Sequence, residues 1–110
     1  MTTSYRVLGQ AAPNATTNVD LYTVPAATQS VVSTLVVANR GSSPATYRIA
    51  IRPAGQSLSN THYVAFDTLV GVADATALTL GLTLAATDVI TVFASSADLT
   101  FSAFGSSIAA

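Results

Sequence analysis

The chain has 110 residues, of which half are hydrophobic and only 8% are charged, so it indicates a single folded domain over residues 1–110 and excludes intrinsic disorder. Its charged residues are four Arg and five Asp, without Lys or Glu, and the net charge of −1 offers no basic field for nucleic-acid phosphates. The chain has no cysteine for disulfides or thiolate metal sites, and its single histidine, His62, excludes every multi-histidine metal motif.

Short runs of Val, Ile, Thr and Tyr, with apolar residues at every second position, predict strands rather than helices. We expect eight strands, at residues 5–10, 19–24, 30–39, 45–52, 62–69, 76–84, 88–94 and 99–104. Turn residues separate them at intervals of about ten residues, a spacing typical of sandwiches and barrels. The predicted fold class is therefore all-β: a single-domain antiparallel β-sandwich, or a jelly-roll-like barrel, with no helix longer than about two turns.

The alternation assigns faces in two of these strands. In residues 45–52, Tyr47, Ile49 and Ile51 share one face, and Arg48 and Arg52 share the other. In residues 76–84, leucines at every second position predict an inward face. We expect the core to include Val36, Tyr47, Ile49, Ile51, Leu78, Leu80, Leu82 and Phe101.

The third and seventh strands do not alternate cleanly, because apolar residues fall on both of their faces. A strand that is apolar on both faces needs cover on both sides, and a neighbouring subunit is the simplest source of that cover. The outward faces consist of small uncharged residues, which suit protein–protein packing, so we expect an obligate assembly. We also expect the arginines to pair with aspartates, within the chain or across a subunit boundary. The predicted subunit-interface residues are Val31, Val37, Arg48, Arg52, Ile90 and Val92.

The sequence offers no defined chemistry. His62, Asp67 and the many serines invite a comparison with a Ser-His-Asp triad, but the chain has no Gly-x-Ser-x-Gly motif. The five aspartates are widely separated, have no Asp-x-Asp-x-Asp calcium pattern, and suit the capping of turns. We therefore predict that the protein is not an enzyme and has no catalytic residue, cofactor or metal ion. The similar stretches at residues 23–28 and 83–87 are interpreted as a shared type of turn rather than a duplication.

Four stretches carry a resemblance to a known class of proteins. They are DLYTVPAAT at residues 20–28, VVSTLVVANR at 31–40, YRIAIRPAG at 47–55 and TLAATDVITVFAS at 83–95. Together they resemble small virion structural proteins of tailed bacteriophages, including cyanobacterial phages. The resemblance extends from Tyr5 to Phe104, and its motifs are those of strands and turns.

The resemblance implies a capsid decoration (cement) protein that stabilises the head shell through protein–protein contacts. The implied partners are other virion proteins, the major capsid protein first, and copies of the chain itself, with a trimer favoured. Neither nucleic acid nor a membrane is expected as a partner, and the implied location is the virion, assembled in the cytoplasm of the bacterial host. One alternative is a neck, tail or baseplate component of the same virion. Another is a carbohydrate-binding module on a phage fibre, which would need an exposed aromatic platform from Tyr5, Tyr22, Tyr47 or Tyr63.

Overall fold

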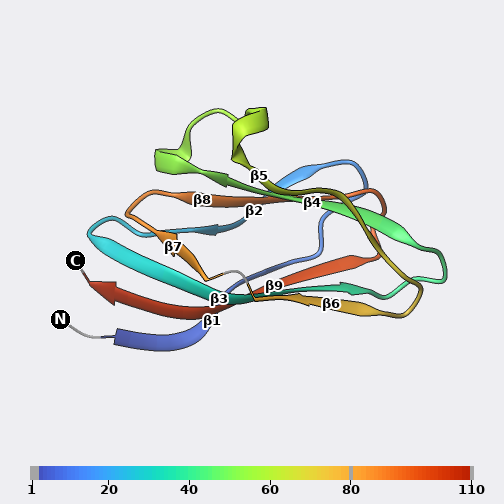
Figure 1. The fold of residues 1–110 in the computed structure, drawn as a ribbon, viewed down its shortest axis with the longest axis horizontal. Coiled ribbons are helices and arrows are strands. Elements are labelled where there is room, and N and C mark those ends of the chain that lie inside the picture. Colours follow the sequence, from blue (N-terminus) through green and yellow to red (C-terminus); the bar gives the residue numbers. More distant parts are fainter. Residues whose placement is uncertain (1–2, 80, 110) are drawn as a thin grey trace.

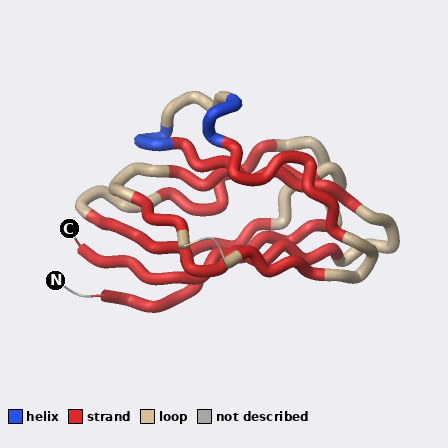
Figure 2. Tube along the Cα trace, in the orientation of Figure 1, coloured by secondary structure: helices blue, strands red, loops and turns tan. Residues whose placement is uncertain are grey.

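The computed structural model describes residues 3–79 and 81–109, and within them the chain forms two antiparallel sheets that pack face to face (Figure 1 and Figure 2). Sheet A contains, in spatial order, β1 (Thr3–Ala11), β9 (Leu99–Ala109) and β3 (Thr28–Asn39), and both β6 (Ala75–Leu78) and β7 (Leu82–Leu84) pair with β3. Sheet B has the order β2 (Asn18–Thr23), β8 (Val89–Ala94), β4 (Ala45–Arg52) and β5 (Tyr63–Val70). The sheets do not close, so the fold is a sandwich and not a barrel.

The all-β prediction is confirmed. The only helices within the described residues are two single-turn 3-10 segments, η1 (Pro53–Gly55) and η2 (Asn60–His62), between β4 and β5. No helix in this part of the chain has the length and apolar character needed to cross a membrane. Seven of the eight expected strands are present, with ends that differ by a few residues, and β9 continues well past residue 104.

The strand expected at residues 76–84 is instead two short strands, β6 and β7, and this corrects the prediction. Both pair with β3, but β6 pairs on one side of a β-bulge in β3 and β7 pairs on the other. The bulge lies between Val32 and Thr34 and shifts the register of β3 by one residue. A single straight strand could not follow both registers, and Gly81, with φ +60, lies between the two pieces.

The same bulge explains why β3 does not alternate in the sequence. Before the bulge, Ser30 and Val32 point into the core, and after it Leu35 and Val37 do so. Side chains of a strand alternate between its two faces, so one extra residue at the bulge exchanges the faces for every residue that follows. Even-numbered residues therefore point inward before the bulge, and odd-numbered residues point inward after it. Val36 consequently lies on the outer face of sheet A, opposite Ala77 and Ser102, and is half-buried, so its assignment to the core was wrong.

The core lies between the two sheets. Tyr47 of β4 packs edge to face against Phe101 of β9, with ring centroids 6.3 Å apart, and both are fully buried. Across the same layer, the hydroxyl groups of Tyr22 in β2 and Ser30 in β3 form a buried hydrogen bond of 2.7 Å. Ile49 is also buried as predicted, whereas three further predicted core residues pack against the core while only partly buried: Ile51, Leu78 and Leu82. Leu80 lies outside the described residues.

Strand β8 has apolar residues on both faces, as the sequence predicts, but the chain itself covers both of them. Ile90, Val92 and Ala94 point into the core. On the outer face, the guanidinium of Arg48 lies 4.5 Å from the ring centroid of Phe93, and the η1 turn lies beside Val89. The expectation that a neighbouring subunit must cover this strand is therefore wrong.

Candidate interaction surface

The charged residues are distributed very unequally between the two sheets. Among the described strands, the five of sheet A carry one charged residue, Arg6, whereas sheet B carries Asp20, Arg48, Arg52 and Asp67. Monomeric proteins usually protect exposed sheets with charged side chains. Sheet A, which lacks this protection, is the candidate interaction surface.

Apolar side chains from three adjacent strands meet on the outer face of sheet A. The register places Tyr5 of β1 beside Ser106 of β9, which in turn lies beside Val31 of β3. In the next row, Val7 lies beside Phe104. Tyr5 is 85% exposed, Val7 48% and Val31 40%, values that are high for large apolar residues.

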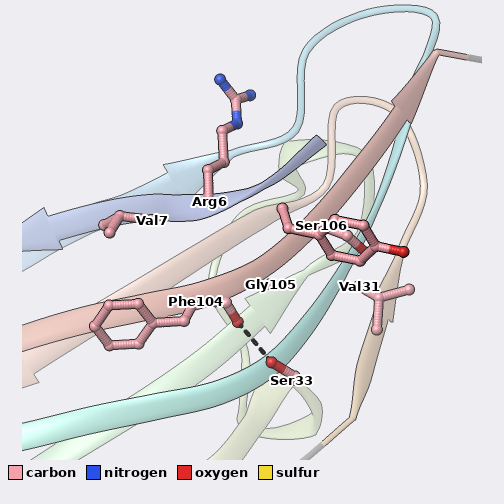
Figure 3. A pocket seen from close by; sticks show the side chains of 8 residues that line it. Arg6, Val7, Val31, Ser33, Phe104, Gly105 and Ser106 are labelled. Atoms are coloured by element: carbon pink, nitrogen blue, oxygen red, sulfur yellow. Dashed lines mark hydrogen bonds between the residues drawn. The ribbon is translucent and has the colours of Figure 1, made fainter. Parts of the chain in front are cut away.

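These residues surround an open hollow of about 530 Å³, shown in Figure 3. The backbone gives the hollow its shape, because both neighbours of β9 have a bulge next to Phe104, one between Val7 and Gly9 and the other between Val32 and Thr34. At the second bulge, the Ser33 hydroxyl donates a hydrogen bond of 3.2 Å to the carbonyl oxygen of Phe104. Figure 3 shows Arg6 directed away from Phe104 and Val31, so the floor of the hollow is uncharged.

Gly105 allows β9 and β3 to approach closely at this place. A Cβ atom on Gly105 would overlap the backbone carbonyl of Val31. A side chain at this position would therefore push β9 and β3 apart and change the shape of the hollow.

The outer face of sheet B is organised around Arg48. Its guanidinium lies between two aromatic rings, 4.2 Å from the centroid of Phe66 and 4.5 Å from that of Phe93. Its Nε also donates a 2.6 Å hydrogen bond to Asp67, and this bond raises the pKa of Arg48 above its usual value. Tyr63 packs edge to face on Phe66, with centroids 4.9 Å apart.

Arg52 has partners on three sides. It donates to the Asp20 carboxylate at 3.0 Å, to the Thr91 hydroxyl at 2.9 Å and to the carbonyl of Gln56 at 3.0 Å. The prediction of arginine–aspartate pairs is thus confirmed for Arg48 and Arg52, and both pairs lie within the chain. Arg40 differs, because it donates to the Thr100 hydroxyl and the Ala97 carbonyl.

The six predicted interface residues are not brought together. Val37, Ile90 and Val92 are fully buried core residues, so they belong to no outer face, and their assignment to a subunit interface is corrected. Arg48 and Arg52 lie on the outer face of sheet B, each in an ion pair within the chain. Only Val31 lies on the outer face of sheet A.

The sequence reasoning missed Tyr5, Val7 and Phe104, which form most of the apolar surface. A signal for them was present, because residues 99–110 contain no charged residue and continue the alternation well beyond the expected end of the last strand. Identifying the surface also required the pairing of β9 with β1 and β3, which no local pattern specifies.

The tyrosines offer little support for an aromatic platform. Tyr22 and Tyr47 are buried, and Tyr63 packs against Phe66. Arg48 occupies a face of Phe66 and of Phe93, which leaves Tyr5 as the one strongly exposed tyrosine of the described chain.

The residues considered for chemistry have local partners. The Nδ1 atom of His62 accepts a 3.1 Å hydrogen bond from the backbone of Ser59 within η2, and Asp67 binds Arg48. Asp88 accepts hydrogen bonds of 2.9 Å from the backbone of Ala54 and of Ala85, as expected for a turn-capping carboxylate. Across residues 3–79 and 81–109, His and Asp side chains form no group of three that could hold a metal ion.

Comparison of the chain with protein-family models, curated protein sequences and solved structures gave no match.

Proposed function

We propose that this chain is a structural protein of a bacteriophage virion that acts through protein–protein contacts, as a capsid decoration protein on the head shell. The observation that carries the proposal is the charge-poor outer face of sheet A, with Tyr5, Val7 and Val31 exposed around an open hollow. The resemblance of the sequence to small virion proteins of tailed phages supplies the biological setting.

The contrast between the two sheets supports this function over an enzymatic one. On sheet B, the charged side chains are satisfied within the chain by two ion pairs. On sheet A, small, hydroxyl-bearing and apolar side chains form a face with few charged groups to desolvate, and a low content of charged residues is characteristic of the centre of a stable interface. A building block needs such a face, whereas catalysis needs convergent polar groups.

A neck, tail or baseplate component would use the same kind of face, so copy number must separate the two positions. The test is quantitative mass spectrometry of purified particles, with the major capsid protein as the internal standard. Hundreds of copies per particle are expected for a shell protein, and six or twelve copies would place the chain in the neck or baseplate. Absence from purified particles would overturn the virion assignment altogether.

The contact surface can be located in the same particles by cryo-electron microscopy. The proposal expects sheet A to face neighbouring proteins and the outer face of sheet B to be more exposed. A glycan array with the purified protein provides the complementary test. Specific binding that is lost in Tyr5→Ala would favour the carbohydrate-binding alternative instead.

A further inference from the structure

The edges of the two sheets differ in how well they are protected against pairing with another strand. Edge strand β2 has six residues, includes Asp20 and has a register shift. Edge strand β5 has two register shifts and includes Asp67, whose φ is +49. On the far side of sheet A, β6 and β7 have only four and three residues. Short length, bulges and charges are the features that prevent edge-to-edge association.

Strand β1 has fewer of these protections over its first half, where it is neither short nor bulged. It has nine residues, and its first five, residues 3–7, are exposed on both faces of the sheet. Arg6 is the one charged residue among them, and the register shift of β1 comes only after Val7. The second half is less accessible, because residues 8, 9 and 11 are part-buried and Gly9 lies so close to the backbone carbonyl of Leu21 in β2 that a Cβ atom would not fit. The continuously exposed part of this edge strand is therefore residues 3–7.

We propose that residues 3–7 of β1 pair antiparallel with the same residues of a second copy, about a two-fold axis at Tyr5. This inference deepens the proposed function by naming a partner for sheet A, and it rests on sheet A being a contact surface but not on a position in a virion. The pairing joins two copies of sheet A into one continuous sheet. The two outer faces of sheet A then lie on the same side.

The symmetry restricts the register. In an antiparallel pair related by a two-fold axis normal to the sheet, the axis must pass opposite one residue, which then faces its own copy. An axis at Arg6 would place two like charges directly opposite each other, which is destabilising. An axis at Ser4 would pair only residues 3–5. An axis at Tyr5 uses all five free residues and sets Thr3 opposite Val7, and Ser4 opposite Arg6.

The small area of this edge limits the expected affinity of the dimer. Five residues per copy bury far less than the roughly 1,600 Å² of a standard stable interface. The structure therefore points to a reversible dimer that becomes persistent when the copies are held close together, as on a particle surface. Its two-fold symmetry also differs from the trimer that the resemblance favours.

Because the chain contains no cysteine, single cysteine variants can test the register directly. Opposite residues in an antiparallel pair have Cα atoms about 4.5 or 5.5 Å apart, within the range of a disulfide. Tyr5→Cys should therefore form a covalent dimer under mild oxidation. Val7→Cys is the matched control, because the two copies of residue 7 lie about 13 Å apart along the strands. Mixing Val7→Cys with Thr3→Cys should restore cross-linking.

A charge variant tests the same pairing without oxidation. Ser4→Asp would place a carboxylate opposite Arg6 of the second copy, twice per dimer, and should tighten the dimer by roughly 2- to 30-fold. Thr3→Asp adds the same charge opposite Val7 and should give no such gain. Sedimentation equilibrium over a range of concentrations measures both effects, together with the wild-type protein.

The expected result is a concentration-dependent wild-type dimer that Tyr5→Cys traps and Ser4→Asp tightens. A wild-type protein that remains monomeric at millimolar concentration, or that sediments as a trimer, would overturn the proposal. So would cross-linking of Val7→Cys alone as efficient as that of Tyr5→Cys. These outcomes concern the isolated protein, so they are distinguishable from failure of the virion assignment, which is decided by the content of purified particles.

Discussion

The hydroxyl group of Tyr47 is buried between the sheets and has no hydrogen-bond partner among the described residues. A buried polar group without a partner costs about 1–3 kcal/mol of stability. We therefore expect Tyr47→Phe to stabilise the protein by about 1 kcal/mol in urea denaturation at pH 7. Tyr22→Phe is the matched control, because the Tyr22 hydroxyl bonds to Ser30 and its removal should instead destabilise by about 1 kcal/mol. A destabilised Tyr47→Phe variant would contradict this reasoning.

The same hydroxyl predicts a dependence on alkaline pH. Burial raises the pKa of Tyr47 in the folded protein above its usual value of about 10, because the interior disfavours the phenolate. Above that value the unfolded chain releases this proton while the folded chain retains it, so the free energy of unfolding falls as the pH rises. Denaturation curves between pH 8 and pH 11 should show a smaller decline for Tyr47→Phe than for the wild type. Equal declines would mean that Tyr47 does not contribute.

Several turns of the described chain hold a residue other than glycine at positive φ. In the turn at residues 26–27, Ala27 has φ +54, and in the similar turn at residues 86–87, Thr87 has φ +68. The two turns are also bonded to each other, since Thr87 donates its backbone N–H to the carbonyl of Val24. This conformation costs an L-residue roughly 1–2 kcal/mol, and glycine adopts it freely.

Ala27→Gly should therefore raise the free energy of unfolding by up to about 1 kcal/mol, once the greater entropy of glycine in the unfolded chain is subtracted. Ala26→Gly is the control, because Ala26 does not have a positive φ and glycine there brings only the entropic cost. Thermal denaturation of both variants measures the difference. Equal melting temperatures for the two variants would refute the claim of backbone strain.

Two elements show where prediction from the sequence succeeds and where it fails. The strands follow from local alternation, so their positions, the antiparallel sandwich and the inward face of β4 could be predicted. The bulge in β3 could not, because an inserted residue looks in the sequence like a strand that is apolar on both faces. The intrachain cover of the outer face of β8 could not be predicted for another reason. In the sequence, an arginine whose guanidinium packs on Phe93 cannot be distinguished from an arginine that extends into solvent.

The Arg48 cluster links β4, β5 and β8 on the outer face of sheet B. Its guanidinium contacts Phe66 and Phe93 and binds Asp67, so Arg48→Ala loses two stacking contacts and one hydrogen-bonded ion pair. We expect a measurable loss of stability in urea denaturation. Asp67→Asn keeps both stacking contacts and should cost less. A larger loss in Asp67→Asn than in Arg48→Ala would show that the ion pair, and not the stacking, stabilises the cluster.

This cluster also changes how the role of the arginines in assembly can be tested. Replacing both Arg48 and Arg52 with Glu would place new carboxylates beside Asp67 and Asp20, so the fold itself would be weakened. A loss of assembly in that double variant would therefore not distinguish an interface defect from a folding defect.

At the scale of the whole molecule, only part of the proposed contact surface could be predicted. Low charge over the chain and apolar residues on both faces of the third expected strand predicted an outer face suited to packing, and Val31 does lie on such a face. The placement of Val37 failed because the bulge in β3 reverses the faces of every residue after it. Phe104 and Val7 become neighbours only through the pairing of β9 with β1, which joins residues nearly one hundred positions apart.

The asymmetry between the sheets leads to a prediction about incorporation into particles. Val7 and Val31 are 48% and 40% exposed on the outer face of sheet A, so replacing both with Lys should leave the fold intact while placing two charges on the proposed contact surface. Burying such charges without partners is costly, and we expect incorporation to fall by at least tenfold, which corresponds to about 1.4 kcal/mol.

Val64 and Val72 supply the control, because they have matching exposures of 48% and 50% but belong to β5 and the turn that follows it. The double Lys variant at these positions changes net charge and apolar area by similar amounts, and it should be incorporated like the wild type. Quantitative mass spectrometry of purified particles, with circular dichroism of each isolated variant, measures incorporation and folding separately. If the Val64 and Val72 variant is the one excluded from particles, the contact surface lies at the β5 edge of sheet B, because both variants would be folded and only the position of the charges would differ.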